Sequence, residues 1–425
     1  MIRRGIMVEP RGDRAGLRLA ASALALLALL LATPEASAGE ATSAAGDAEI
    51  RAIDPPAAAG AFAPRLVAGD GELLATWWER VAAAEGTRRH RLLFARRTGT
   101  WSSPSVVVEA EDLFANWADF PTVIREPAGS LLAHWLAKTS ADTYAYSIEL
   151  ARSSDDGRSW QRIGRLNDDD TDTEHGFVSL VVEGDAVRAF WLDGRAMAAG
   201  GPMGLRTALV GETVGPSELL DPRVCECCPT AAVATPGGAV IVYRDRADDE
   251  TRDIYALRGR AGSWEGPEPV ARDDWRIPGC PVNGPSIAHR DGRTAVAWFT
   301  AKEGAPRVAV AFGVAGGVPM VVDDGKPLGR VGVALDADGS AIVSWLAVVG
   351  DEAEVRLRRV ADGAAGRVLA LGRTSHARSS GVPQLVRRGD TLFVGWVEDL
   401  GDGPSRLRVR EVPVARVPGL EGPPG

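Results

Sequence analysis

The sequence predicts an all-β protein that folds as a single β-propeller, with seven blades favoured over six. Two observations predict this fold. A short apolar strand ending in an aromatic residue recurs seven times along the chain, and no helical pattern separates the copies. The chain has 425 residues, of which 45% are hydrophobic and 25% are charged, so it can bury a full core and its composition does not indicate disorder.

The N-terminal region is predicted to be a signal peptide rather than part of the fold. Several arginines precede an apolar run over residues 19–32, which is too short to cross a bilayer, and Ala36-Ser37-Ala38 forms a typical cleavage site. We therefore expect a signal peptide over residues 1–38, a flexible segment over 39–48, and a periplasmic or secreted protein. No later apolar segment is long enough to indicate a membrane span.

The repeated strand reads LLATWW, LLAHW, VRAFW, AVIVY, TAVAW, AIVSW and LFVGW. Each copy follows another strand and a turn that usually contains Gly and Asp, and precedes a third strand; several copies continue into a fourth. Such a unit is typical of a propeller blade, with strands A to D. We expect the propeller over residues 49–415 and a flexible tail over 416–425. The last repeat lacks a fourth strand, and residues 49–54 are predicted to supply it.

Candidate functional residues gather in loops that a propeller brings to one face. Because successive strands are antiparallel, the D–A loops between blades and the B–C loops within blades share one face, here called the top face. The polar and aromatic residues predicted there are Asn116, Trp117, Asp119, Lys138, Glu174, His175, Asp193, Arg195, Arg244, Asp245, Arg246, Arg252, Trp275 and Asn283.

These residue types indicate an anionic ligand over blades 3 to 5. Arginine forks bind carboxylates and phosphates in a bidentate way, and desolvated carboxyl groups beside them can carry protons. The predicted ligand-binding residues are Arg195, Arg244, Arg246, Arg252, Asn283, Trp275 and Arg330, and the candidate catalytic residues are Asp245, Asp193, His175 and Tyr243. The alternative is that the arginines and carboxylates form a network that ties the blades together.

Composition narrows the possible partners. The formal net charge of −9 argues against nucleic acid, which requires a concentrated basic face. The expected partner is an anionic glycan or another small anion, the expected oligomeric state is a monomer, and no cofactor is indicated.

The four cysteines lie in two loops before neighbouring repeats. Cys225, Cys227 and Cys228 occur in VCECCPT, and Cys280 occurs in GCPVNGP. In an exported protein an even number of cysteines favours disulfides. We favour a Cys228–Cys280 bond across two blades, although Cys225 or Cys227 is also able to take that role. The alternative is a thiolate site for Zn²⁺ or Cu⁺.

One turn in the second repeat resembles a known motif. Ser153, Asp155, Gly157 and Trp160 form S-x-D-x-G-x-x-W, which is similar to the Asp-box (BNR repeat) of the sialidase/neuraminidase superfamily of propellers; Trp101 and Trp264 mark degenerate copies. The resemblance covers about residues 49 to 415. It implies a structural turn, in which Asp155 accepts hydrogen bonds from its own loop and Trp160 packs between blades.

The resemblance also implies a sialidase-like exo-glycosidase or another glycan-directed protein. Active members of that superfamily hold the substrate carboxylate with three arginines and use a tyrosine activated by a glutamate, with an aspartate as acid/base. The usual Arg-Ile-Pro motif of the first blade is absent, since Ala63-Pro64-Arg65-Leu66 stands there. Arg195, Arg246 and Arg330 are a possible substitute triad. The alternatives are a non-catalytic glycan- or protein-binding propeller and a cysteine-dependent, metal-binding periplasmic protein.

Overall fold

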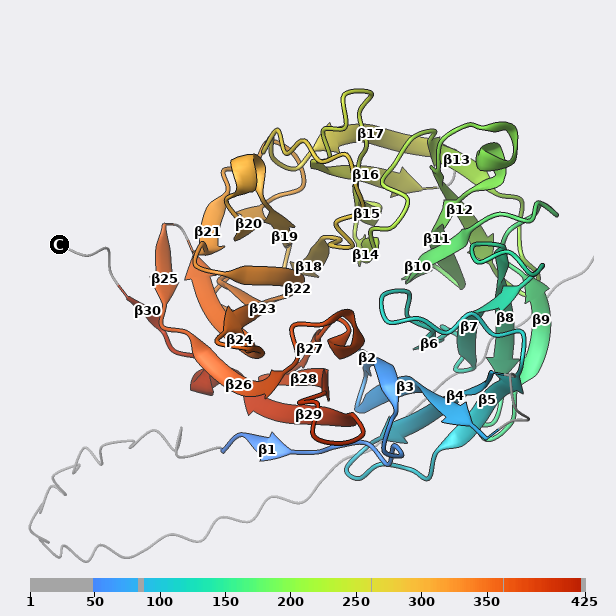
Figure 1. Cartoon of the computed structure of the whole chain (residues 1–425), viewed down its shortest axis with the longest axis horizontal. Helices are drawn as coiled ribbons and strands as arrows, with labels where there is room; N and C mark the ends of the chain where they lie inside the picture. Colours follow the sequence, from blue (N-terminus) through green and yellow to red (C-terminus); the bar gives the residue numbers. More distant parts are fainter. Residues whose placement is uncertain (1–48, 83–87, 261, 362, 422–425) are drawn as a thin grey trace, which may run out of the picture. The chain divides into compact units, whose positions relative to one another are not determined.

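The computed structural model describes residues 49–82, 88–260, 262–361 and 363–421. These residues form a ring of seven antiparallel sheets, so the predicted seven-bladed propeller is confirmed and the six-bladed alternative is wrong (Figure 1). The predicted signal peptide and the segment 39–48 lie outside the described residues. No helix in the described ranges is long and apolar enough to cross a membrane.

Each blade runs outward from an inner strand in chain order. Blades 1 to 3 contain β2 (Phe62–Gly69), β3 (Glu72–Val81), β4 (Arg89–Arg97) and β5 (Ser105–Ala110); β6 (Thr122–Arg125), β7 (Leu131–Lys138), β8 (Tyr146–Ser153) and β9 (Gln161–Arg165); and β10 (His175–Glu183), β11 (Ala186–Asp193), β12 (Gly204–Val210) and β13 (Glu218–Asp221).

Blades 4 to 7 follow the same order. They contain β14 (Ala231–Thr235), β15 (Gly238–Arg244), β16 (Ile254–Arg260) and β17 (Ser263–Pro269); β18 (Ser286–Arg290), β19 (Arg293–Thr300), β20 (Arg307–Phe312) and β21 (Met320–Asp323); β22 (Pro327–Leu335), β23 (Ala341–Val349), β24 (Glu352–Ala361), β25 (Ala364–Gly366) and β26 (Leu369–Thr374); and β27 (Gln384–Arg388), β28 (Thr391–Glu398) and β29 (Arg406–Pro413). Short 3₁₀ turns are Arg195–Ala199, Lys302–Gly304, Arg378–Ser380 and Val414–Arg416.

The N-terminal end of the described chain closes the ring. β1 (Arg51–Ala52) pairs antiparallel with β29, with Arg51 opposite Glu411, and supplies the outer strand that blade 7 lacks (Figure 1). Asp54 strengthens this closure, because its carboxylate accepts hydrogen bonds from the Arg408 and Arg410 side chains at 2.9 Å. The closure predicted from residues 49–54 is therefore confirmed.

The C-terminal end differs from the sequence prediction. β30 (Leu420–Glu421) pairs with β25 on the outer edge of blade 6, so the described part of the predicted flexible tail is held by a sheet. Blade 6 offers that edge because its outermost layer is split: β25 and β26 both pair with β24 and leave β25 free on its other side.

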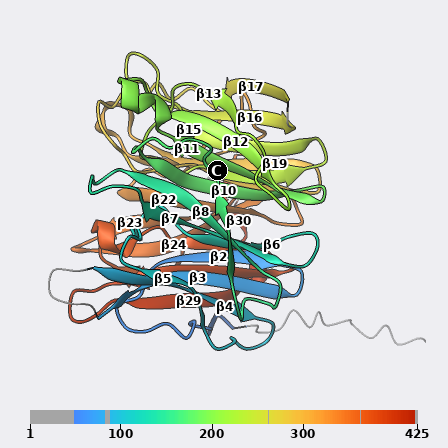
Figure 2. The same ribbon diagram turned by 90° about the vertical axis from the view of Figure 1, so that its right-hand side faces the viewer.

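The core lies between the blades, whose sheets pack face to face (Figure 2). The seven repeated strands are β3, β7, β11, β15, β19, β23 and β28, and the aromatic residue of each is at most 5% exposed. Large rings suit this position because they cover the wedge-shaped space between neighbouring sheets. Trp78, for example, packs in one cluster with Leu113 and Val123 of the next blade.

The turn that resembles an Asp-box is held by hydrogen bonds within its own loop. Asp155 Oδ1 accepts a hydrogen bond from the Ser159 backbone N–H at 2.9 Å, and the Ser153 hydroxyl accepts one from Gly157 N at 2.8 Å. Trp160 packs edge-on against Phe94 of blade 1, with 5.6 Å between ring centroids. Gly157 has φ of 83°, and a Cβ there would lie 2.3 Å from the Phe94 ring, so glycine is required.

Candidate functional site

A basic pocket opens on the top face over blades 7, 1 and 2. Its volume is about 830 Å³, within the range of small-ligand sites. The B–C loops of blades 1 and 7 and the D–A loops before blades 2 and 7 line it together, as expected of loops that share one face. Its lining residues include Arg80, Arg88, Arg89 and His90, with Phe62, Asn116, Trp117, Ser379 and Asp399.

The pocket wall is electropositive and partly aromatic. Burial lowers the pKa of His90, and the positive charges of Arg80 and Arg88 lower it further. The Arg80 guanidinium lies 5.0 Å above the Phe62 ring, and Phe62 meets His90 edge-on. Glu109 offsets part of this charge through its ion pair with Arg89 at 2.9 Å. Asp399 is the acidic residue in the wall itself, so the balance of charge there is positive.

The loop between β5 and β6 separates this pocket from a second one at the centre of the ring. Asn116 fixes the loop, because its side-chain Oδ1 accepts hydrogen bonds from the backbone N–H groups of Ala118 and Asp119 at 2.7 and 2.8 Å. Asn116 and Trp117 line the basic pocket, whereas Ala118 and Asp119 line the central cavity of about 250 Å³. Trp117 also lies under the Arg330 guanidinium, 4.9 Å from the ring centroid.

Two carboxyl groups with raised pKa values lie at this boundary. Burial raises the pKa of Asp119 to about 7, against the opposing hydrogen bond from Phe177 N, and the nearby Glu174 carboxylate raises it further. Burial also raises the pKa of Glu174 to about 7, although the Tyr146 hydroxyl donates to its Oε1 at 2.5 Å. Carboxyl groups with pKa values near neutrality are able to act as both acids and bases.

An irregular inner strand makes room for Asp119. The pairing of β10 with β11 shifts between Gly176 and Ser179, and Phe177 there has φ of 53°, which is strained for a residue with a side chain. Phe177 N consequently donates to Asp119 Oδ2 at 2.7 Å. Gly176 is required beside it, since a Cβ would lie 2.2 Å from the same oxygen.

The predicted residues of blade 3 form a closed ion network. Arg195 donates to Asp193 Oδ1 at 2.7 Å and to Asp168 Oδ1 at 2.7 Å. His175 is fully buried, with Nε2 3.1 Å from Asp169 Oδ1 and Nδ1 3.1 Å from the Tyr146 carbonyl. The structure therefore brings these predicted residues together, but each is held by the others.

The predicted arginines of blade 4 are also paired. Arg246 contacts Glu226 and Glu250, and Arg252 bonds the same two carboxylates at 3.0 and 2.8 Å. Arg244 is 1% exposed and donates to the backbone carbonyls of Asn283, Arg252 and Phe299. Arg244 therefore ties blade 4 to blade 5, as in the alternative interpretation from the sequence, whereas Arg246 and Arg252 are paired within blade 4 and the loop that enters it.

Tyr243 and Asp245 lie beside that network. Tyr243 is fully buried, and burial and the neighbouring Asp221 carboxylate raise its pKa, so it is not poised as a nucleophile. Its hydroxyl donates to Asp221 Oδ2 at 2.6 Å. Burial, with the Asp221 charge, raises the pKa of Asp245 to about 6, which keeps Asp245 a candidate proton carrier.

The remaining predicted ligand-binding residues face inward. Trp275 is 5% exposed and packs edge-on against Phe299, so the expectation of a rim residue is wrong. Asn283 and Arg330 line the central cavity, where the Asn283 side chain accepts a hydrogen bond from Arg330 N at 2.7 Å. The Arg330 guanidinium bonds Ser380 Oγ and the Gly381 carbonyl, both at 2.8 Å.

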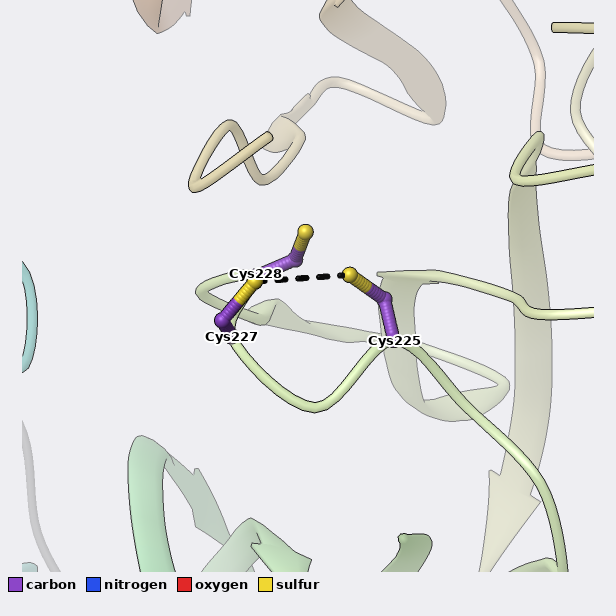
Figure 3. A group of neighbouring side chains, drawn as sticks. All are labelled: Cys225, Cys227 and Cys228. Carbon is purple, nitrogen blue, oxygen red and sulfur yellow. Dashed lines mark hydrogen bonds between the residues drawn. The ribbon is translucent and has the colours of Figure 1, made fainter. Parts of the chain in front are cut away.

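All four cysteines lie in the described residues and none forms a disulfide, so the predicted Cys228–Cys280 cross-link is absent. The two cysteine loops do meet, but the contact to Cys280 is a hydrogen bond with the Cys227 thiol. Cys225, Cys227 and Cys228 point toward one another (Figure 3), and their three sulfur atoms lie within 4.8 Å of one another.

Sequence reasoning missed several residues of the site. Tyr146 was not recognised as a top-face tyrosine, although it opens a C strand and therefore lies where B–C loops end. Arg80, Arg88 and His90 flank the B–C loop of blade 1, and the run RRH at 88–90 was a signal in the sequence that the concentration of charge in repeats 2 to 5 obscured.

Comparisons with known proteins support the fold. No protein-family model matches the sequence, and no curated protein matches it. Among solved structures, a polysaccharide lyase is 8% identical, with a TM-score of 0.52, over 82% of this chain and 89% of its own. An arabinanase from Penicillium chrysogenum is 14% identical (TM-score 0.48; 87% and 98% covered), and a sialidase from Trypanosoma rangeli is 12% identical (TM-score 0.43; 78% and 59% covered). The likeness to the polysaccharide lyase supports the propeller fold.

Proposed function

We propose that this protein binds an anionic glycan in the basic pocket over blades 7, 1 and 2. The observation that carries this proposal is the lining of that pocket: three arginines and a histidine beside the rings of Phe62 and Trp117. Guanidinium groups recognise carboxylates, and indole faces stack on the apolar faces of sugar rings. A polysaccharide lyase has the same scaffold, which is consistent with a carbohydrate ligand. At 8% identity the likeness shows the fold and does not identify the ligand.

A glycan array tests the binding proposal. We expect binding to sialylated or uronic-acid glycans but not to their neutral counterparts, with affinity falling as salt rises, since the recognition is charge-assisted. Arg88→Ala should weaken binding about tenfold or more, because a hydrogen bond to a charged group contributes about 1.5 to 3 kcal/mol. Arg276→Ala is the matched control, since Arg276 is an exposed arginine of another top-face loop and pairs with Asp249. Equal binding of neutral glycans would contradict the proposal.

A second function, cleavage of the bound glycan, is favoured by two neighbouring carboxyl groups. Asp119 follows two residues of the pocket wall, Asn116 and Trp117, and lines the adjoining central cavity, and Glu174 lies near Asp119. Asp119 and Glu174 both have pKa values raised to about 7, and the Tyr146–Glu174 hydrogen bond pairs the residue types that sialidases use. In this proposal Asp119 acts as the acid/base. Burial and the charges of Glu174 and Asp119 raise the pKa of Tyr146 well above its usual value, so its hydroxyl orients Glu174 by donating to it and is not the nucleophile.

Hydrolysis of a fluorogenic sialoside, followed by uronosides, tests the second function. Asp119→Asn should reduce turnover by about 10²- to 10⁴-fold without changing affinity as strongly, since that is the usual contribution of an acid/base. Asp245→Asn is the matched control, because Asp245 is another desolvated top-face carboxyl group, lying outside both pockets. If Asp245→Asn abolishes turnover and Asp119→Asn does not, the site lies over blades 3 to 5, as the sequence predicts.

A further inference from the structure

Three cysteine thiols converge on the top face in the loop before blade 4, and Cys280 lies in the adjoining loop before blade 5. Cys225 Sγ and Cys227 Sγ are 4.0 Å apart, and Cys228 Sγ lies within 4.8 Å of both (Figure 3). The Cys280 thiol joins from the second loop through its hydrogen bond with Cys227. This cluster lies outside the basic pocket and the central cavity, and neither binding nor cleavage of a glycan uses it.

The spacing of the sulfur atoms suits a metal ion. A tetrahedral thiolate site with metal–sulfur bonds of about 2.3 Å has sulfur–sulfur edges of about 3.8 Å. The 4.0 Å between Cys225 Sγ and Cys227 Sγ is already close to that edge. Small side-chain rotations therefore bring the thiols to metal-binding distance without rebuilding the backbone.

Two buried arginines lie beside the thiols. Arg252 is 2% exposed, and its Nη1 donates to Cys225 Sγ at 3.3 Å. Arg244 is 1% exposed, and its backbone carbonyl accepts a hydrogen bond from Cys225 N at 2.9 Å. Two buried guanidinium groups thus offset part of the negative charge that several thiolates around one cation retain.

The backbone holds the two loops in place independently of any ion. Cys225 N donates to the Arg244 carbonyl at 2.9 Å, which anchors the first loop to blade 4. The loops touch so closely at Pro229 and Gly284 that a Cβ on Gly284 would lie 1.9 Å from the Pro229 carbonyl oxygen. Cys225 and Cys228 are buried, whereas Cys227 is partly exposed and Cys280 exposed, so an ion is able to reach the cluster from solvent.

We propose that Cys225, Cys227 and Cys228, with Cys280 as fourth ligand, bind one thiophilic d¹⁰ metal ion, Zn²⁺ or Cu⁺. Thiolates select these two ions among the common biological metals. Each thiol that binds releases its proton to solvent, and no electron transfer is involved. This site is independent of the proposed glycan function.

Metal titration of the reduced full chain without oxygen tests the proposal. We expect one Zn²⁺ or one Cu⁺ per chain, a rise in Tm with the bound ion but not with Mg²⁺, and protection of the cysteines from a thiol reagent. Cys227→Ser should weaken binding at least a hundredfold. Thr230→Ala is the matched control, because Thr230 lies in the same loop and its hydroxyl donates to the Phe177 carbonyl, away from the thiols. This variant should bind as the unsubstituted chain does.

Titrating the Cys280→Ser variant with each ion distinguishes a four-thiolate site from a three-thiolate site. Stoichiometric Zn²⁺ binding that Cys280→Ser weakens supports a four-thiolate site, and Cu⁺ binding that Cys280→Ser leaves unchanged supports a three-thiolate one. If Cys227→Ser does not fold, thiol protection in the unsubstituted chain still gives the answer. The proposal is overturned if neither ion binds one per chain, or if Cys227→Ser and Thr230→Ala bind equally.

Discussion

The top face contains two basic regions that differ in what their arginines contact. Over blades 3 and 4, Arg195, Arg246 and Arg252 each bond at least two carboxylates, and Arg244 bonds three backbone carbonyls. Over blades 7, 1 and 2, Arg80 lies on an aromatic ring, and the arginines impose a positive field on His90. The first region is a network of satisfied ion pairs and hydrogen bonds, in which Arg244 joins blade 4 to blade 5, and the second region is the wall of a cavity.

This difference shows why counting arginines along the sequence does not locate a ligand. A guanidinium whose donors are already satisfied contributes to stability, and a ligand must first displace its partners. In the wall of the basic pocket Arg89 is paired with Glu109, whereas Arg80 lies over the Phe62 ring, where a ligand need not first displace a carboxylate. Loss of a paired arginine should lower the free energy of unfolding, whereas loss of a pocket arginine should change the charge in the pocket.

The largest effect is expected for the most buried tie. Arg244→Leu should lower the free energy of unfolding by about 3 to 5 kcal/mol, because it removes a buried charged donor from three carbonyl oxygens at the junction of blades 4 and 5. Urea denaturation measures this change. A loss below about 1 kcal/mol would show that water replaces the guanidinium and that the junction does not depend on it.

The next effect concerns Asp119 and depends on pH. The pKa of Asp119 is raised to about 7 by burial, against about 3.9 in the unfolded chain, so between these values the folded state binds the extra proton. The free energy of unfolding should therefore fall as pH rises from about 4 to about 7. Asp119→Asn, which mimics the protonated form, should be more stable than the unsubstituted chain at pH 8 by about 2 to 4 kcal/mol and equal to it near pH 4.

Glu174→Gln provides the comparison for that experiment. Burial also raises the pKa of Glu174 to about 7, so Glu174→Gln should remove a further part of the pH dependence of the free energy of unfolding. Unchanged curves for both variants would mean that these carboxyl groups are ionised throughout, which would also remove the support for an acid/base role.

A smaller loss of stability is expected for a tie nearer the surface. Arg246 is paired with Glu226 and Glu250, but its side chain is 25% exposed, so solvent screens these pairs. Arg246→Gln should lower the free energy of unfolding by about 1 kcal/mol or less and leave glycan binding unchanged. Thermal denaturation and the glycan array check both parts; weakened binding would return the ligand to blades 3 to 5.

The sequence predicted the architecture because the fold repeats its own pattern. Seven strands with an aromatic end specify seven wedge-shaped interfaces, and a missing fourth strand in the last blade specifies the partner of β1. The direction of each loop then followed from strand alternation, which placed Asn116, Trp117 and Asp119 on the top face. The pairing of β30 with blade 6 had no such signal, since two residues at the chain end form no pattern.

The site itself was less predictable because it depends on contacts between loops. The sequence does not show that Arg246 contacts Glu226, twenty residues away. Nor does it show that Asp193 bonds Arg195, whereas Arg80 lies over the Phe62 ring. The raised pKa of Asp119 likewise results from an irregularity in β10 that becomes visible only once the strands are paired. The residue types in the sequence predicted arginines and carboxyl groups on the top face. Which of them line a cavity depends on burial and pairing in the folded structure.

The smallest effect on stability is expected for an arginine of the basic pocket. Its loss should instead change the pKa of the neighbouring His90. Arg80 is exposed, so Arg80→Gln should change the free energy of unfolding by no more than about 0.5 kcal/mol. The same substitution removes one of the charges that lower the pKa of His90, so that pKa should rise. NMR titration of the His90 ring measures the shift, with Arg246→Gln as the control that leaves it unchanged. If the pKa of His90 stays constant in Arg80→Gln, the positive field over blades 7, 1 and 2 does not come from this wall, and the contrast between the two regions fails.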